Sequence, residues 1–178
     1  MRCLALIFTL ILAQARSERI ETPAPDAQWI KTDDLSMIAL ERERLANQLT
    51  AYVAHSLHSS SRSKRGLWSQ RLLGLALTIH PTNPRAVQTG QALSSDEKVP
   101  ELGLEVDPEV LGQLLFHRAT HLVGSKSLAD QAIAPFLMAA SAYIHPDFED
   151  AVYASERHHL EKGGLNWHPI SGEPSPES

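Results

Sequence analysis

Two histidines four residues apart are the first candidates for chemistry in this sequence. His117 and His121 form an H-x-x-x-H pattern in a segment whose spacing predicts a helix. Residues four apart share a helix face, so the two imidazoles could bind one metal ion. The zinc-protease pattern has glutamate directly after the first histidine, where this chain has Arg118. Both histidines align with Val110 and Leu114, so we interpret them as polar residues that flank an apolar stripe, with a metal-dependent hydrolase as the alternative.

Other candidate groups are His158 and His159, which lie near a predicted helix end and could interact with its negative terminus. Either could complete a metal site with His117 and His121 only if the fold brought it close. An acidic run carries five carboxylates without the spacing of a calcium loop: Glu97, Glu101, Glu105, Asp107 and Glu109. The sequence contains no nucleophile elbow, phosphate loop or dinucleotide fingerprint. We therefore predict a non-catalytic protein with no catalytic residue, no resident metal and no cofactor.

The first fifteen residues predict an export signal. Arg2 precedes an apolar run from Leu4 to Ala13, and a small-x-small motif ends at Ala15. We predict cleavage after Ala15, with an uncleaved anchor as the alternative. The chain's one cysteine, Cys3, lies inside this segment, so the mature chain would hold no disulfide and no thiolate metal site. This combination favours a bacterial envelope, periplasmic or secreted protein.

The charge balance argues against a nucleic-acid partner. The chain has 16 Lys plus Arg and 21 Asp plus Glu, a formal net charge of −5. The basic cluster at residues 62–65 follows a run of serines and is interpreted as a solvated loop. No stretch after the first fifteen residues is long and apolar enough to span a membrane, so we predict no transmembrane segment in the mature chain.

The pattern of residues 32–162 is helical, between a flexible leader at 16–31 and a mostly disordered tail at 163–178. Trp167 of the tail could dock back on the helical domain. Five of the six predicted helices begin at capping residues, and the helix from Leu67 to Ile79 is predicted from its apolar stripe alone. These capping residues are Thr32 to Asp34, Asn83 before Pro84, Asp107 before Pro108, Ser127 with Asp130, and Asp147. Pro135 either kinks its helix, which we favour, or marks its start. No segment alternates with period two, so we predict an all-α fold without a sheet.

A repeated nonapeptide indicates that the helices form two tandem units. IHPTNPRAV at 79–87 recurs as IHPDFEDAV at 144–152, an offset of 65 (144 − 79) with five identical residues. Without gaps, residues 43–93 match residues 108–158 at eleven of 51 positions. This self-similarity predicts about six helices in two helix–helix–turn–helix units, at about 34–94 and 108–162.

The stretch from Leu72 to Leu93 resembles the join between two tetratricopeptide repeats. In that family a small residue, an aliphatic residue and proline end the second helix, and Asn and an inward Ala often follow. The matching residues are Ala76, Leu77, Pro81, Asn83 and Ala86, and in the second unit Ser141, Ala142, Pro146 and Ala151, with Phe148 where Asn83 stands. The offset of 65 departs from the family's 34 residues. The resemblance implies a helical repeat that binds a protein or peptide in a groove, without chemistry of its own.

We therefore interpret the nonapeptides as structural repeat joints rather than paired active-site histidines. At each joint an isoleucine, Ile79 or Ile144, makes the last core contact of its helix. A histidine before proline, His80-Pro81 or His145-Pro146, then ends the helix. The next helix starts at a capping residue, Asn83 or Asp147, and an alanine, Ala86 or Ala151, returns the chain to the core. The imidazoles are expected to meet the terminal carbonyls. The predicted function is a protein-interaction or scaffold module of the cell envelope, and a homodimer is a further prediction. A purely structural envelope protein is the remaining alternative.

Overall fold

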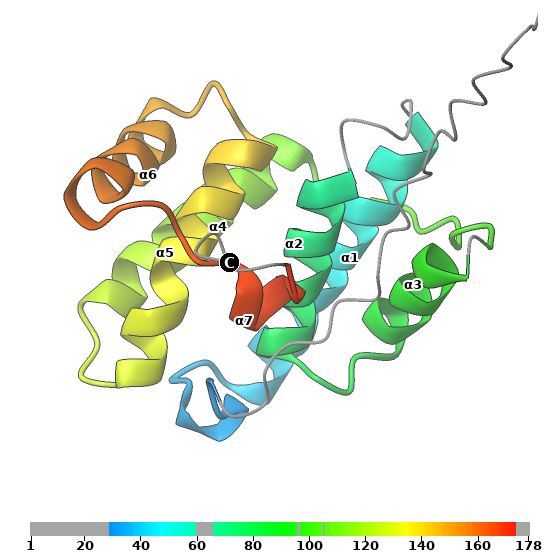
Figure 1. Ribbon diagram of the computed structural model, residues 1–178, viewed down its shortest axis with the longest axis horizontal. Helices are drawn as coiled ribbons and strands as arrows, with labels where there is room; N and C mark the ends of the chain where they lie inside the picture. Colours follow the sequence, from blue (N-terminus) through cyan, green and yellow to red (C-terminus); the bar gives the residue numbers. More distant parts are fainter. Residues whose placement is uncertain (1–28, 60–65, 96, 105, 174–178) are drawn as a thin grey trace, which may run out of the picture.

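The computed structural model describes residues 29–59, 66–95, 97–104 and 106–173, and this part of the chain is all-α as predicted. It contains seven α-helices and one short 3-10 helix, and no strand occurs among these residues. The helices are η1 (Thr32–Asp34), α1 (Ala39–Ser59), α2 (Gly66–Ile79), α3 (Pro84–Ser94), α4 (Pro108–Val123), α5 (Leu128–Ile144), α6 (Glu149–Lys162) and α7 (His168–Ser171). Figure 1 shows α1, α2 and α3 on one side of the molecule, α4, α5 and α6 on the other, and α7 between them.

Three of the predicted helix starts are confirmed. Asn83 accepts a hydrogen bond from the backbone of Ala86, Asp107 caps α4 through Glu109, and Ser127 caps α5 through Asp130. In each case a side-chain oxygen satisfies an N–H of the first turn that has no partner within the helix.

Two predicted starts are wrong. Phe148, not Asp147, occupies the N-cap position of α6, and no side chain bonds to the first turn there. Glu149 and Asp150 instead place negative charge in that turn, where the helix dipole favours it. At the other end of the chain, residues 32–34 form the separate helix η1, and α1 begins only at Ala39.

Pro135 lies inside α5 and does not mark its start. The helix runs from Leu128 to Ile144 through the proline. Such a residue removes one backbone hydrogen bond and crowds the preceding turn, at a typical cost of about 3 kcal/mol. Phe136 and Leu137, which directly follow it, are both buried in the core.

The core is built mainly from aliphatic side chains of α1, α2, α4 and α5. α1 packs against α2, α4 packs against α5, and α6 lies on α5. Fully buried members include Leu49, Leu72, Leu75, Leu115, Ile133 and Leu137. Burying one such side chain typically contributes about 1.5–3 kcal/mol.

The two helix triplets, α1–α3 and α4–α6, match in where their helices end and begin, but their third helices pack differently. α2 and α5 end at Ile79 and Ile144, and α3 and α6 begin at Pro84 and Glu149, 65 residues apart in both cases. However, α3 packs on both α1 and α2, whereas the main partner of α6 is α5. The difference is visible on the first helices. Leu45 and Leu49 of α1 are 4% and 0% exposed, but their counterparts Val110 and Leu114 of α4 are 53% and 46% exposed.

Both predicted flanking segments contribute to the core where the structure describes them. The end of the predicted leader packs through Trp29, and Ile30 is buried. The predicted disordered tail is wrong for residues 163–173, because they form α7 and bury Trp167 and Ile170. Apolar side chains in an otherwise polar, proline-rich segment docked here because α2 and α5 leave an apolar surface for them. The predicted signal peptide, its cleavage site after Ala15 and the basic cluster at 62–65 lie outside the described residues.

Candidate functional site

The histidines predicted as an alternative metal site lie on an outer face of α4. His117 and His121 are both exposed. The ring of His117 lies edge-on to that of Phe116, with 5.9 Å between centroids. No group of three His, Cys, Asp or Glu side chains suited to a metal ion occurs in the described part of the chain. The structure therefore brings neither His158 nor His159 to this pair.

The residues of the two predicted joints lie at the ends of α2 and α5 and at the starts of α3 and α6. Ile79, Ile144, Ala86 and Ala151 are buried, and Asn83 is fully buried with its amide donating to Asn47 Oδ1 at 2.9 Å. Pro81 and Pro146 are exposed in the turns. The expectation that the imidazoles meet terminal carbonyls is wrong, because the Nδ1 atoms of His80 and His145 are buried and make no hydrogen bond to a described residue.

At the second joint, packing rather than hydrogen bonding holds the imidazole. The His145 ring stacks on Phe148 with 5.6 Å between centroids. A Cβ atom at Gly112 would lie 2.5 Å from His145 Cβ, so α4 approaches the joint closely only because residue 112 is glycine. The neighbouring Ser141 hydroxyl donates to Gly112 O at 2.6 Å. The joint is therefore a tight helix contact.

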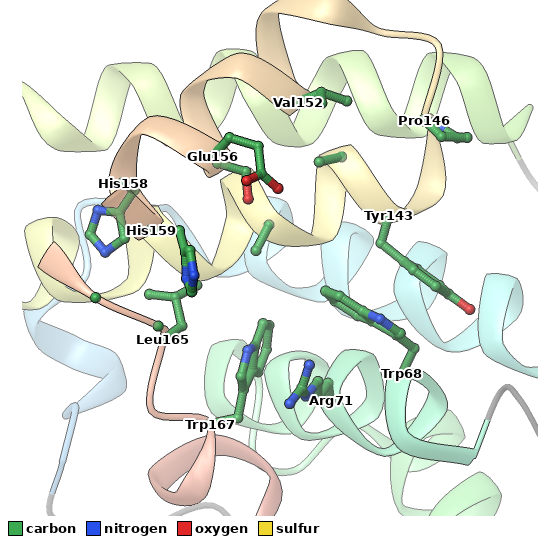
Figure 2. A pocket seen from close by; sticks show the side chains of 15 residues that line it. Trp68, Arg71, Tyr143, Pro146, Val152, Glu156, His158, His159, Leu165 and Trp167 are labelled. Carbon is green, nitrogen blue, oxygen red and sulfur yellow. The ribbon is translucent and has the colours of Figure 1, made fainter. Parts of the chain in front are cut away.

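The main candidate site is a groove whose lining residues were not predicted from the sequence. It has a volume of about 550 Å³ and lies between α2, α5, α6 and residues 163–167. The residues that define its chemistry are Trp68, Arg71, Tyr143, Glu156, Leu165 and Trp167 (Figure 2). We call it the aromatic groove.

The aromatic residues on the floor of the groove, Trp68, Tyr143 and Trp167, belong to a longer chain of packed aromatic rings. Trp68 stacks on Tyr143 at 4.3 Å and meets Trp167 edge to face at 5.5 Å. Trp167 in turn packs edge-on against Phe136 at 4.9 Å, and Phe136 against Trp29 at 5.3 Å. Edge-to-face and stacked pairs of this kind are typically worth about 0.5–1.5 kcal/mol each beyond the area they bury. All three tryptophans of the chain thus belong to one cluster.

Arg71 joins the groove floor to the C-terminal segment. It lies one turn after Trp68 on α2, so both side chains share a face. Its guanidinium lies 5.2 Å from the Trp68 ring centre and 5.1 Å from that of Trp167. Its Nε and Nη2 donate to the two carboxylate oxygens of Glu173 at 2.9 and 3.0 Å. This bidentate pair is partly buried, so the positive charge of Arg71 is already matched.

Residues 163–173, which we call the C-terminal strap, form one wall of the aromatic groove. Gly163 and Gly172 have φ of 84° and 74°, a region that favours glycine, and they frame the strap. Between them Ser171 O accepts a hydrogen bond from Gln70 Nε2 at 3.1 Å. A Cβ atom at Gly74 would lie 2.3 Å from Ile170 O, so α2 and α7 touch through their backbones. The strap is therefore fixed to α2 at several points.

The opposite wall is a face of α6. Val152, Ser155, Glu156 and His159 recur at helical spacing and line the groove. In Figure 2 the carboxylate of Glu156 points into the space above Trp68 and Trp167, and His159 lies beside Leu165. Glu156 has no ion pair or hydrogen bond with a described residue.

A second polar cluster lies away from the groove and holds the segment before α1. The buried carboxylate of Asp130 accepts hydrogen bonds from the backbone N–H of Ser36 at 2.9 Å and from the Ser36 hydroxyl. Burial alone would raise the pKa of Asp130, but the hydrogen bonds from Ser125 and Ser36, with the charge of Arg118, outweigh it and hold the pKa below its usual range. Asp130 thus stays ionised at neutral pH, and its role is structural.

Comparison with known proteins identifies no relative. No family model, curated protein or solved structure matches this chain. Within the described residues, none of the helices is both long and apolar enough to cross a membrane. The class that the fold defines is an all-α protein of two helix triplets, with an aromatic groove lined by residues of both.

Proposed function

We propose that this chain is an exported, non-catalytic helical-repeat protein that serves as a protein-interaction or scaffold module in the cell envelope. The observation that carries the proposal is the aromatic groove, a concave site with three aromatic side chains and the carboxylate of Glu156, which pairs with no described residue. Tryptophan and tyrosine are enriched where proteins bind one another, because they bury large rigid surfaces at little cost in side-chain entropy.

The tetratricopeptide-like repeat remains part of the proposal. It is supported by the 65-residue offset that relates the ends of α2 and α5 and the starts of α3 and α6. The different packing of α3 and α6 departs from a regular array, in which each unit would pack alike. A homodimer stays a prediction, as does export, which rests on the sequence before Arg16 and would be tested by finding Arg16 at the amino terminus of the mature protein.

The proposal is tested by a substitution that fills the aromatic groove and leaves its aromatic residues and the C-terminal strap unchanged. Ala142 lines the groove and is half-buried, so Ala142→Trp would occupy part of its volume. Tyr153→Trp adds an indole to an exposed position of α6 that does not line the groove, and serves as the matched control. We expect envelope proteins retained by the wild-type chain and the Tyr153→Trp variant to be lost with Ala142→Trp. Identical retention by all three chains would instead favour the purely structural envelope protein.

The metal-dependent hydrolase is kept as a prediction from the sequence alone. Metal analysis of the purified protein tests it independently of the groove. Stoichiometric zinc that is lost on His121→Ala would favour that alternative over a purely non-catalytic module.

A further inference from the structure

The aromatic groove carries a charge imbalance that restricts its partner. Among the described residues that line it, Arg71 and Glu156 are the two with a full charge at neutral pH. Arg71 is neutralised in place by both carboxylate oxygens of Glu173. The carboxylate that remains available to a partner is Glu156, and His158 and His159, whose imidazoles also line the groove, form no ion pair with it in the described structure.

The arginine and the lysine of α6 do not pair with Glu156. Arg157 lies over the Tyr153 ring at 5.9 Å and 3.9 Å from Glu161, and neither Arg157 nor Lys162 lines the groove. The apolar part of the groove, by contrast, is continuous from Tyr143 and Trp68 to Trp167 and Leu165 (Figure 2). An aromatic surface beside a carboxylate attracts cations through both the ring quadrupole and the ion pair.

We infer that the aromatic groove binds an extended peptide segment with a bulky apolar side chain next to a lysine or arginine. The apolar side chain lies on the Trp68 and Trp167 floor, and the cation pairs with Glu156. This inference rests on the proposed interaction function and adds the chemistry of the partner. An acidic segment would meet Glu156 with like charge, and it would find Arg71 already paired.

The probes are three acetylated, amidated pentapeptides, Ala-Leu-X-Leu-Ala with X as Lys, Gln or Glu. Binding of each to the full chain is followed through the indole N–H signals of Trp68 and Trp167 in ¹⁵N NMR spectra. Trp29 does not line the groove and serves as an internal reference. Because Glu156 is exposed, we expect the Lys peptide to bind about two- to fivefold more tightly than the Gln peptide, with the Glu peptide last.

Glu156→Gln should abolish the difference in affinity between the Lys, Gln and Glu peptides, whereas Glu161→Gln should preserve it. Glu161 is the matched control because it is an exposed glutamate on the same helix and does not line the groove. If the peptides shift the signals of Trp68 and Trp167 without a basic preference, or if the order survives Glu156→Gln, the charge inference is overturned and the interaction function stands. If no peptide shifts those two signals, both are contradicted.

Discussion

At the residue scale, Asp130 shows how one buried carboxylate fixes a segment far from it in the chain. It holds Ser36 through two hydrogen bonds across 94 positions, and Ser127 donates to Asp34 O at 2.8 Å beside it. Removing the acceptor leaves the Ser36 N–H without its partner. We expect Asp130→Ala to lower the free energy of unfolding by about 1–3 kcal/mol, measured by urea denaturation at pH 7.

The pH dependence of that loss has a defined sign. Because the folded-state pKa of Asp130 is depressed, its contribution is fully present above the unfolded value of about 3.9 and is lost as the pH falls through the lower folded value. The wild-type advantage over Asp130→Ala should therefore be constant near neutrality and shrink in acid. Asp33→Ala, an exposed aspartate in η1, is the control and should change little at either pH.

The two joints provide a second prediction, since one is capped and the other is not. Asn83 caps α3 and also bonds to Asn47, while Asp147 bonds to no described residue. Asn83→Ala should lower the unfolding free energy by about 1–2 kcal/mol, and Asp147→Ala should change it by less than about 0.5 kcal/mol. Thermal unfolding followed by circular dichroism measures both. An equal loss in the two variants would show that Asp147 does cap α6 in solution.

At the element scale, the docking of α7 depends on the missing side chain at Gly74. A methyl group there would meet Ile170 O at 2.3 Å and Ile170 C at 2.9 Å, and both are backbone atoms that cannot rotate away. We expect Gly74→Ala to displace the C-terminal strap, redden the emission of Trp167 and cost about 1–3 kcal/mol. Gly103→Ala has nothing within 4 Å and should leave the emission unchanged. An unshifted spectrum in Gly74→Ala would mean that α7 does not pack on α2 as described.

The helices were predictable from sequence because their determinants are local. Asn83-Pro84 and Asp107-Pro108 begin helices through contacts within three residues, and both starts were predicted. Asp147 was wrongly predicted as the N-cap of α6 because it lies one residue before the true N-cap, Phe148, and the sequence pattern does not resolve a shift of one residue. The outward position of His117 and His121 followed from their place beside the apolar stripe of α4.

At the scale of the whole molecule, the residues that line the aromatic groove could not be predicted from the sequence. Its floor joins Trp68, Tyr143 and Trp167, which come from α2, α5 and the strap and share no short pattern. The strap itself was predicted to be disordered from its glycines and prolines, yet Gly163 and Gly172 permit the turns that frame it. The sequence does contain a local pattern for one wall of the groove, because Val152, Ser155, Glu156 and His159 of α6 recur at helical spacing.

The two helix triplets are joined by segments from both ends of the described chain. Near its start, residues 29–38 reach α5 through Trp29 and Ser36, and near its end the strap links α2 to α5 through Trp167. The aromatic groove therefore lies where the two helix triplets meet, and its shape depends on the C-terminal strap. A partner that binds there would contact both triplets, since α2 belongs to one and α5 and α6 to the other (Figure 1).

The most direct test of the interaction module is photo-crosslinking in the native cell. A photoreactive residue at Ser155 lines the groove, and one at Gln88 is exposed on α3, away from it. We predict a discrete protein adduct from position 155 that is absent from position 88 and is lost when Ala142→Trp is added. No adduct from position 155, or the same adducts from both positions, would contradict the proposal that this chain binds a partner in the aromatic groove.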